Sequence, residues 1–134
     1  MEQEDYLMRQ INQLARMLGK LALDLIELKN KGQVSIGIEV SNHVLKDEID
    51  CDIQKLINIP TDNFVNKLTI EKLFNNDCFE KLAEIFLIIA DSMNETERKN
   101  LYEKCLMIFE YLEKTDNVYS IDRQWKIEWI KTLI

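Results

Sequence analysis

Hydrophobic residues recur along this chain mostly with the spacing of α-helices. Between positions 5 and 29, seven apolar residues follow one another at steps of four and three, which places them on one stripe of a helix. These residues are Leu7, Ile11, Leu14, Leu18, Leu21, Leu25 and Leu28. Met8, Ala15, Met17, Ala22 and Ile26 widen the stripe beyond a coiled-coil seam. The pattern predicts the central helix of a bundle, ending at the NKG sequence of residues 30–32, with an exposed homodimerising zipper as the alternative.

The segment 33–45 fits two different periods. Val34, Ile36, Ile38 and Val40 alternate with polar or small residues, which is typical of a half-buried strand. Val34, Ile38, Ser41, Val44 and Leu45 also have helical spacing. A single strand in an otherwise helical chain would leave its backbone groups without partners, so a helix is favoured. On that helix, Gly37 and Ser41 are small residues at which a neighbouring helix can approach closely.

Short elements are expected between residues 46 and 77. The acidic residues Asp47, Glu48, Asp50 and Asp52 are favourable near a helix N-terminus and predict the solvated start of a short helix ending before Pro60. They lack the glycine and the closing glutamate of a calcium-binding loop. A second short helix, capped within residues 61–63, is expected to run to about Leu68, and Thr69 to cap a turn over 70–74.

The second half predicts three longer elements. A helix over 78–90 is apolar around most of its circumference and is expected to be deeply buried, and it forms an antiparallel hairpin with a helix over 95–114. Asn94 and Ser120 are candidate N-caps. A last helix, 120–134, covers the hairpin with Trp125, Trp129, Ile130 and Leu133, whereas Ile121 and Ile127 lie at other angles. Tyr119, Arg123, Trp125 and Trp129 form a possible interaction face; the alternative is that the tryptophans close the core.

Composition restricts the fold and the partners. The chain has 134 residues, the size of one domain, and only three glycines and one proline, which favours a compact all-α multi-helix bundle over β-folds. Its net charge of −7 argues against nucleic acid and anionic membranes as partners. The longest apolar run is far shorter than the roughly 18 residues of a membrane span, and the acidic start is unlike a secretory signal. A cytoplasmic location is therefore expected.

The sequence contains no recognisable catalytic constellation. Cys51, Cys78 and Cys105 form no CxxC pair, which suits reduced thiols; they are equally spaced, but their flanking sequences do not repeat. His43 is the only histidine, so neither a zinc site nor a histidine-activated nucleophile is indicated. No phosphate-binding glycine loop is present. We therefore expect no enzyme activity, no cofactor and no metal.

Four sequence segments carry a resemblance. Residues 5–14 (DYLMRQINQL), 47–56 (DEIDCDIQKL) and 109–115 (FEYLEKT), together with Ser120–Gln124, resemble a family of small bacterial all-helical proteins of unknown function. The second half also resembles a tetratricopeptide-type helical hairpin, although the usual tryptophan, glycine and proline positions are missing from 82–115. The resemblance implies a bacterial, cytoplasmic helical protein and supplies no activity and no site residues.

The favoured function is a protein–protein interaction or scaffolding module that binds another protein or a second copy of itself. The alternative is a small ligand-binding helical domain or enzyme, with a pocket between the N-terminal helix and the 78–114 hairpin. A third hypothesis is a subunit that is unstable without its partner, which predicts a large exposed apolar patch.

Overall fold

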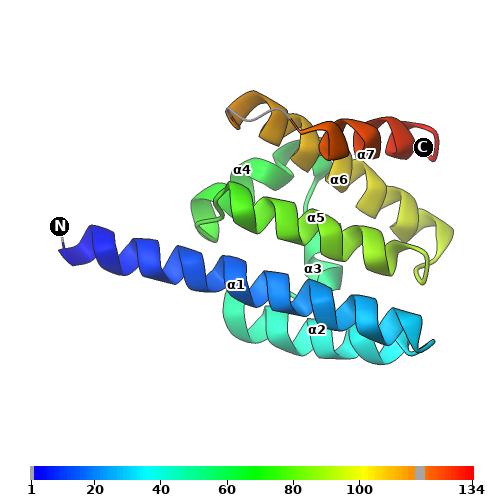
Figure 1. Cartoon of the computed structure of the whole chain (residues 1–134), viewed down its shortest axis with the longest axis horizontal. Helices are drawn as coiled ribbons and strands as arrows, with labels where there is room; N and C mark the ends of the chain where they lie inside the picture. The colour runs from blue at the N-terminus through cyan, green and yellow to red at the C-terminus, as the bar shows by residue number, and fades with distance from the viewer. Residues whose placement is uncertain (1, 117–119) are drawn as a thin grey trace.

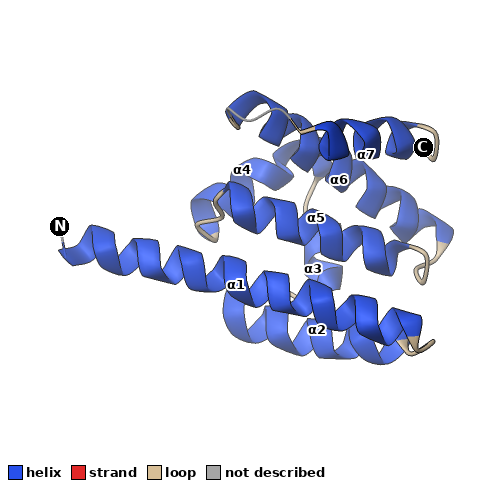
Figure 2. Ribbon diagram, viewed as in Figure 1, coloured by secondary structure: helices blue, strands red, loops and turns tan. Residues whose placement is uncertain are grey.

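The computed structural model describes residues 2–116 and 120–134, with side chains from Asp5 onward, and every regular element in these ranges is helical (Figure 2). The elements are α1 (Glu2–Asn30), α2 (Val34–Ile49), α3 (Ile53–Asn58), the 3-10 turn η1 (Thr61–Asn63), α4 (Phe64–Glu71), α5 (Asn76–Ala90), α6 (Glu95–Thr115) and α7 (Ile121–Lys131). The predicted all-α class is confirmed. Whether the hairpins are of the tetratricopeptide type stays a prediction.

Two antiparallel helical hairpins form the body of the molecule, α1 with α2 and α5 with α6 (Figure 1). They are joined because α1 packs along α5. The short elements α3, η1 and α4 connect the hairpins and contact α6, while α7 lies across α6 at the far side from α2. None of the described helices is long and apolar enough to cross a membrane.

The turn between α1 and α2 has a defined geometry. Gly32 adopts a φ of +70°, and the amide of Gln33 donates to the carbonyl of Leu28 at 2.8 Å, which together close the end of α1 as a Schellman motif. Residues 34–49 are helical, so the predicted helix is confirmed and the alternative strand is wrong. A Cβ at Gly37 would lie 2.8 Å from Leu25 Cδ2, which confirms that α1 approaches α2 closely at this glycine.

The core is one cluster to which every helix contributes. The predicted deep burial of residues 78–90 is confirmed, since Phe79, Leu82 and Phe86 of α5 are fully inaccessible. The caps predicted at Asn94 and Ser120 are present: Asn94 Oδ1 accepts from the amide of Glu97 at 2.8 Å, and Ser120 Oγ accepts from the amide of Arg123 at 3.1 Å. These caps fix where α6 and α7 begin. The side-chain cap predicted within residues 61–63 is wrong, since Asn63 precedes α4 without a side-chain hydrogen bond to it.

The first turns of α1 extend beyond the rest of the bundle (Figure 1). Tyr6, Leu7 and Met8 are exposed, Ile11 and Leu14 are half-buried, and full burial begins at Leu18. The prediction that the whole apolar stripe packs in a core therefore holds only for the second half of this helix. The first half presents part of its stripe to solvent.

Two local predictions between the hairpins are wrong. Asp47 and Glu48 lie in the last turn of α2 rather than at the start of a helix, and only Asp52 serves as an N-cap, accepting from the amide of Lys55 at 2.9 Å. Thr69 does not cap a turn over 70–74. It lies inside α4 and donates its hydroxyl to the carbonyl of Val65 at 2.8 Å.

Candidate functional site

The last helix, α7, has one buried side and one exposed apolar side. Ile127 and Ile130 are buried against the bundle. Ile127, which the sequence analysis places at another angle, therefore faces the core as Ile130 does. Ile121, Trp125 and Trp129 follow one another at steps of four and are 76%, 64% and 39% exposed. Leu133, just beyond the helix, is also exposed. We refer to Ile121, Trp125, Trp129 and Leu133 as the α7 face.

The two tryptophans of the α7 face form a single aromatic surface. Their ring centroids are 6.3 Å apart and their planes differ by only 9°, so the rings are stacked. The prediction that Trp125 covers the hairpin is wrong, because nearly two thirds of its surface is open to solvent. Exposed tryptophans on a rigid helix are typical of binding surfaces, where they supply a large contact area with little loss of conformational entropy.

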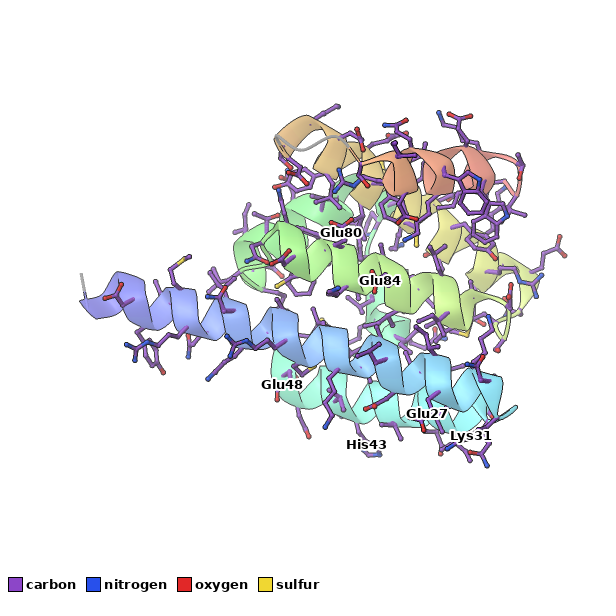
Figure 3. The ribbon with its side chains drawn as sticks, in the orientation of Figure 1. Glu27, Lys31, His43, Glu48, Glu80 and Glu84 are labelled. Carbon is purple, nitrogen blue, oxygen red and sulfur yellow. The ribbon has the colours of Figure 1, made fainter. Side chains whose placement is uncertain are left out.

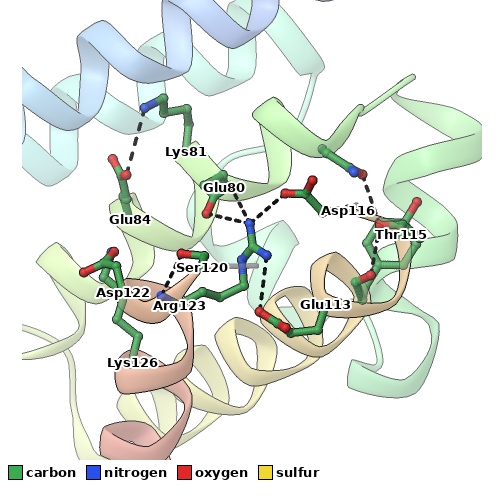
Figure 4. Close-up of polar contacts among 12 residues, drawn as sticks. Glu80, Lys81, Glu84, Glu113, Thr115, Asp116, Ser120, Asp122, Arg123 and Lys126 are labelled. Carbon is green, nitrogen blue, oxygen red and sulfur yellow. Dashed lines mark hydrogen bonds and ion pairs between the residues drawn. The ribbon is translucent and has the colours of Figure 1, made fainter. Parts of the chain in front are cut away.

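Arg123 holds α7 in place (Figure 4). Its guanidinium lies within 3.2 Å of a carboxylate oxygen of Glu80 on α5 and of Glu113 on α6, and within 3.0 Å of Asp116. Arg123 is only 3% exposed. The prediction of an exposed interaction face therefore needs correction at this position, because Arg123 points into the protein and joins α7 to both helices of the second hairpin.

The charge balance around Arg123 explains its burial. Removing a guanidinium from water favours its neutral form, but the hydrogen bonds that Arg123 donates to Asp116 and Glu80 and the charge of Glu80 outweigh this effect, and the pKa of Arg123 rises above its usual value. One cation faces three carboxylates, so the cluster keeps a net negative charge. Among the described residues, Arg123 Nε has no hydrogen-bond partner.

Trp129 is fixed from its other side by Tyr102 on α6. The two rings meet edge to face, with centroids 6.2 Å apart. The Tyr102 hydroxyl donates to Asp91 at 3.3 Å, and Lys29 at the end of α1 forms an ion pair with the same carboxylate at 3.3 Å. Burial, reinforced by the charge of Asp91, raises the pKa of Tyr102, so the hydroxyl stays protonated and keeps donating. Trp129 of the α7 face is thus linked to α6 and, through Asp91, to the end of α1.

Of the four residues predicted for an interaction face, Trp125 and Trp129 lie together on an exposed surface and Arg123 is buried. Tyr119 lies outside the described residues. Sequence reasoning missed Ile121 as a member of the face. The sequence does contain a signal for it: Ile121, Trp125 and Trp129 are spaced at steps of four and so share one face of the helix. Ile127 and Ile130, three residues apart, share a different face.

A buried lysine was not foreseen. Lys104 on α6 is fully inaccessible, and its Nζ donates to the Ile57 carbonyl at 3.0 Å, to Asn100 Oδ1 at 2.7 Å and to Thr61 Oγ1 at 3.5 Å. Burial lowers its pKa to about 8, with the charge of Glu103 acting in the opposite direction. All three ammonium protons have acceptors, so this lysine joins α6 to the end of α3 and to η1.

The buried cysteines are chemically inert in this arrangement. Burial raises the pKa of both the Cys78 and the Cys105 thiols, and protonated thiols are poor nucleophiles. Among the described residues, no three cysteine, histidine, aspartate or glutamate side chains are grouped to hold a metal ion. His43 lies on the outer side of α2 and points away from the bundle (Figure 3).

An open hollow of about 440 Å³ lies beside the first half of α1. Its walls are α1 around Ile11 and Leu14, the end of α2 at residues 47–50, and residues 71–73 after α4. No residue of 78–114 lines it. This hollow is therefore not at the place considered in the sequence analysis, the interface between α1 and the second hairpin, where Gly19 of α1 lies against the side chain of Lys81.

Comparison with known proteins adds no assignment, since no protein-family model, no curated protein and no solved structure matches the chain.

Proposed function

We propose that this protein is a protein–protein interaction module that binds its partner through the α7 face. The observation that carries the proposal is the stacked, exposed pair of Trp125 and Trp129 on a helix that is clamped from behind by Arg123. A surface of this kind is costly to leave in water and is already ordered before binding, so little entropy is lost on association.

The size of the expected effect follows from the exposed area. A tryptophan side chain buries on the order of 200 Å² when fully covered. Because Trp125 is 64% exposed, covering the remainder removes roughly 130 Å² from water, about 3 kcal/mol at 25 cal/mol per Å². This value lies in the range found for the interface residues whose truncation costs most binding energy. Trp125→Ala should therefore lower the affinity for the partner by about 100-fold.

The partner is either another protein or a second copy of this chain. A second copy is tested first, by sedimentation velocity across a range of protein concentrations. If the chain self-associates through the α7 face, the double variant that combines Trp125→Ala and Trp129→Ala should be monomeric at concentrations where the wild type is not. If the wild-type protein remains monomeric, affinity capture from its own host lysate with the wild-type and double-variant proteins identifies a partner of another kind.

The matched control is Ile70→Ala, because Ile70 is a large apolar residue on α4 that is 73% exposed and distant in sequence from α7. The proposal expects a purified partner to bind the wild-type and Ile70→Ala proteins equally, and the folded double variant far more weakly. Trp125 and Trp129 are the only two tryptophans in the chain, so their fluorescence emission should shift to shorter wavelength on binding. A partner that binds the double variant with unchanged affinity would refute this use of α7.

The same proposal places the protein in the cytoplasm, because three free cysteines without a disulfide suit a reducing compartment.

A further inference from the structure

A second surface, distinct from the α7 face, combines apolar and acidic groups. The hollow beside α1 is lined by Ile11 and Leu14, and its rim carries Asp47, Glu48 and Asp50 at the end of α2 and Glu71 at the end of α4. Figure 3 shows Glu48 at the end of α2 where α1 begins to extend beyond the bundle. We call this region the α1–α2 groove.

The carboxylates of the α1–α2 groove lack ion-pair partners within the described part of the chain. Lys72 is the only basic residue among those lining the hollow, against four acidic ones. Asp47 and Glu48 also lie in the last turn of α2, where the helix dipole is negative and carboxylates are unfavourable. The fold therefore concentrates uncompensated negative charge beside apolar side chains, and no structural contact accounts for it.

Strained backbone borders the same hollow. Asp50 and Leu73 are the two non-glycine residues with positive φ among those described, at 55° and 57°, and both line the groove. Leu73 is moreover 48% exposed, and a leucine side chain makes no local hydrogen bond that would compensate for the left-handed conformation. A left-handed position after a helix is normally filled by glycine. The side chain of Leu73 is held at the groove at a cost to the fold.

The apolar part of the groove continues along the extended start of α1. Leu7, Ile11 and Leu14 lie on one helical stripe; Leu7 is exposed, while Ile11 and Leu14 are half-buried. The first turns of α1 extend past the end of α2 (Figure 1), and Ile11 and Leu14 line the hollow there together with residues 47–50. The shape therefore suits an added helix.

We propose that the α1–α2 groove binds a basic amphipathic helix of another protein. Its apolar side chains would contact Ile11, Leu14 and Leu73, and its lysines or arginines would face Asp47, Glu48, Asp50 and Glu71. The negative end of the α2 dipole adds to this attraction. A second copy of the chain is disfavoured, because its net charge of −7 would bring like charges together at the groove.

The first test uses a fluorescently labelled synthetic helix with leucines on one face and lysines on the other, and fluorescence anisotropy as the readout. The groove variant is Asp47→Asn, Glu48→Gln and Glu71→Gln. The control variant is Asp24→Asn, Asp62→Asn and Glu110→Gln, which removes the same net charge from exposed positions elsewhere. We expect the groove variant to bind the peptide at least about 10-fold more weakly than the wild type, and the control variant less than about 3-fold more weakly.

Salt separates specific from diffuse attraction. Raising the ionic strength should shrink the difference between the wild type and the groove variant, while the leucine contacts retain measurable binding of both proteins. The groove variant should also unfold at a higher urea concentration than the wild type, because it removes two carboxylates from the negative end of α2. Loss of binding therefore cannot be attributed to loss of the fold.

Leu73→Gly tests the apolar half of the groove. Glycine adopts a φ of +57° without strain, so this variant should raise the midpoint of urea unfolding. It should also weaken binding of the peptide, because the leucine side chain is lost from the groove. The double variant of Trp125 and Trp129 should bind the peptide as the wild type does, which separates this proposal from that for the α7 face. The proposal is overturned if the wild type does not bind the peptide, if groove and control variants are weakened equally, or if Leu73→Gly leaves the affinity unchanged.

Discussion

Replacement of Lys104 by methionine should change how the stability of the protein depends on pH. Lys104 is fully inaccessible and its pKa falls from 10.5 to about 8. At about 1.4 kcal/mol for each unit of pKa, the charged form of this side chain destabilises the folded state by about 3 kcal/mol relative to its neutral form. The charge is tolerated because oxygen atoms of Ile57, Asn100 and Thr61 accept hydrogen bonds from the ammonium group.

The sign follows from proton counting. Below about pH 8, Lys104 is charged in both the folded and the unfolded protein, and the folded state carries the full cost. Between about pH 8 and 10.5 the folded protein has lost the proton and the unfolded protein still holds it, so stability increases with pH. The free energy of unfolding of the wild type, minus that of Lys104→Met, should therefore rise by about 3 kcal/mol over this interval.

Urea unfolding followed by far-ultraviolet circular dichroism measures this difference at a series of pH values. The raised pKa values of Cys78, Cys105 and Tyr102 lower stability at alkaline pH, but they act in both proteins and cancel. Lys99→Met, which removes an exposed lysine from the same helix, is the control. A difference between wild type and Lys104→Met that stays constant from neutral pH to about 10.5 would refute the reasoning.

Near neutral pH the same variant should change stability little. Methionine removes the buried charge, a gain of about 3 kcal/mol, but it leaves the Ile57 carbonyl and Asn100 Oδ1 without their donor. Each unsatisfied acceptor costs about 1–3 kcal/mol, so the two together cost about 2–6 kcal/mol, which offsets most or all of the gain. The pH dependence, and not the stability at one pH, is therefore the informative measurement.

The contacts in the structure predict the effect of three further substitutions on stability. Gly37→Ala should destabilise by about 1–2 kcal/mol in urea unfolding, because its Cβ would lie 2.8 Å from the buried Leu25 and this overpacking exceeds the gain in helix propensity. Gly19→Ala should instead stabilise by up to about 1 kcal/mol, since its Cβ would meet Lys81 at an ordinary 3.6 Å; destabilisation would show that α1 and α5 lie closer together. Arg123→Met should destabilise the protein by about 2–4 kcal/mol, because three carboxylates lose their shared cation. Amide hydrogen exchange should increase in α7 before it does elsewhere, and unchanged exchange in α7 would refute the role of Arg123 in holding this helix.

The helices could be predicted because helical periodicity is a local property. The ambiguity over residues 33–45 also has a local cause. Ile36 and Val40 are apolar residues on the exposed side of α2, and with the half-buried Val34 and Ile38 they create an alternation that is typical of a strand. The acidic residues from 47 onward suit a helix start as well as a helix end, because sequence alone does not locate the end of the preceding helix.

The candidate site could be predicted only in part, because burial at its residues depends on distant segments. A charged Arg123 was expected on the surface, but Glu80, Glu113 and Asp116 come together around it from two other elements and from the chain after α6. From the sequence, Trp125 and Trp129 fit either core residues or binding residues, because their burial depends on how α7 lies on α6. The groove needs α1, α2 and the end of α4 together, so no single stretch of sequence indicates it.

The two halves of α1 have different thermodynamic support within one continuous helix. From Leu18 onward, side chains buried in the core resist opening of the backbone, whereas the turns around Tyr6 to Met8 depend mainly on their own hydrogen bonds. Amide exchange should therefore slow progressively from the start of α1 towards its centre. A partner helix bound in the α1–α2 groove would slow amide exchange in the first turns of α1 selectively. Binding would therefore change the local unfolding equilibrium at the start of α1 and leave that of its buried half unchanged.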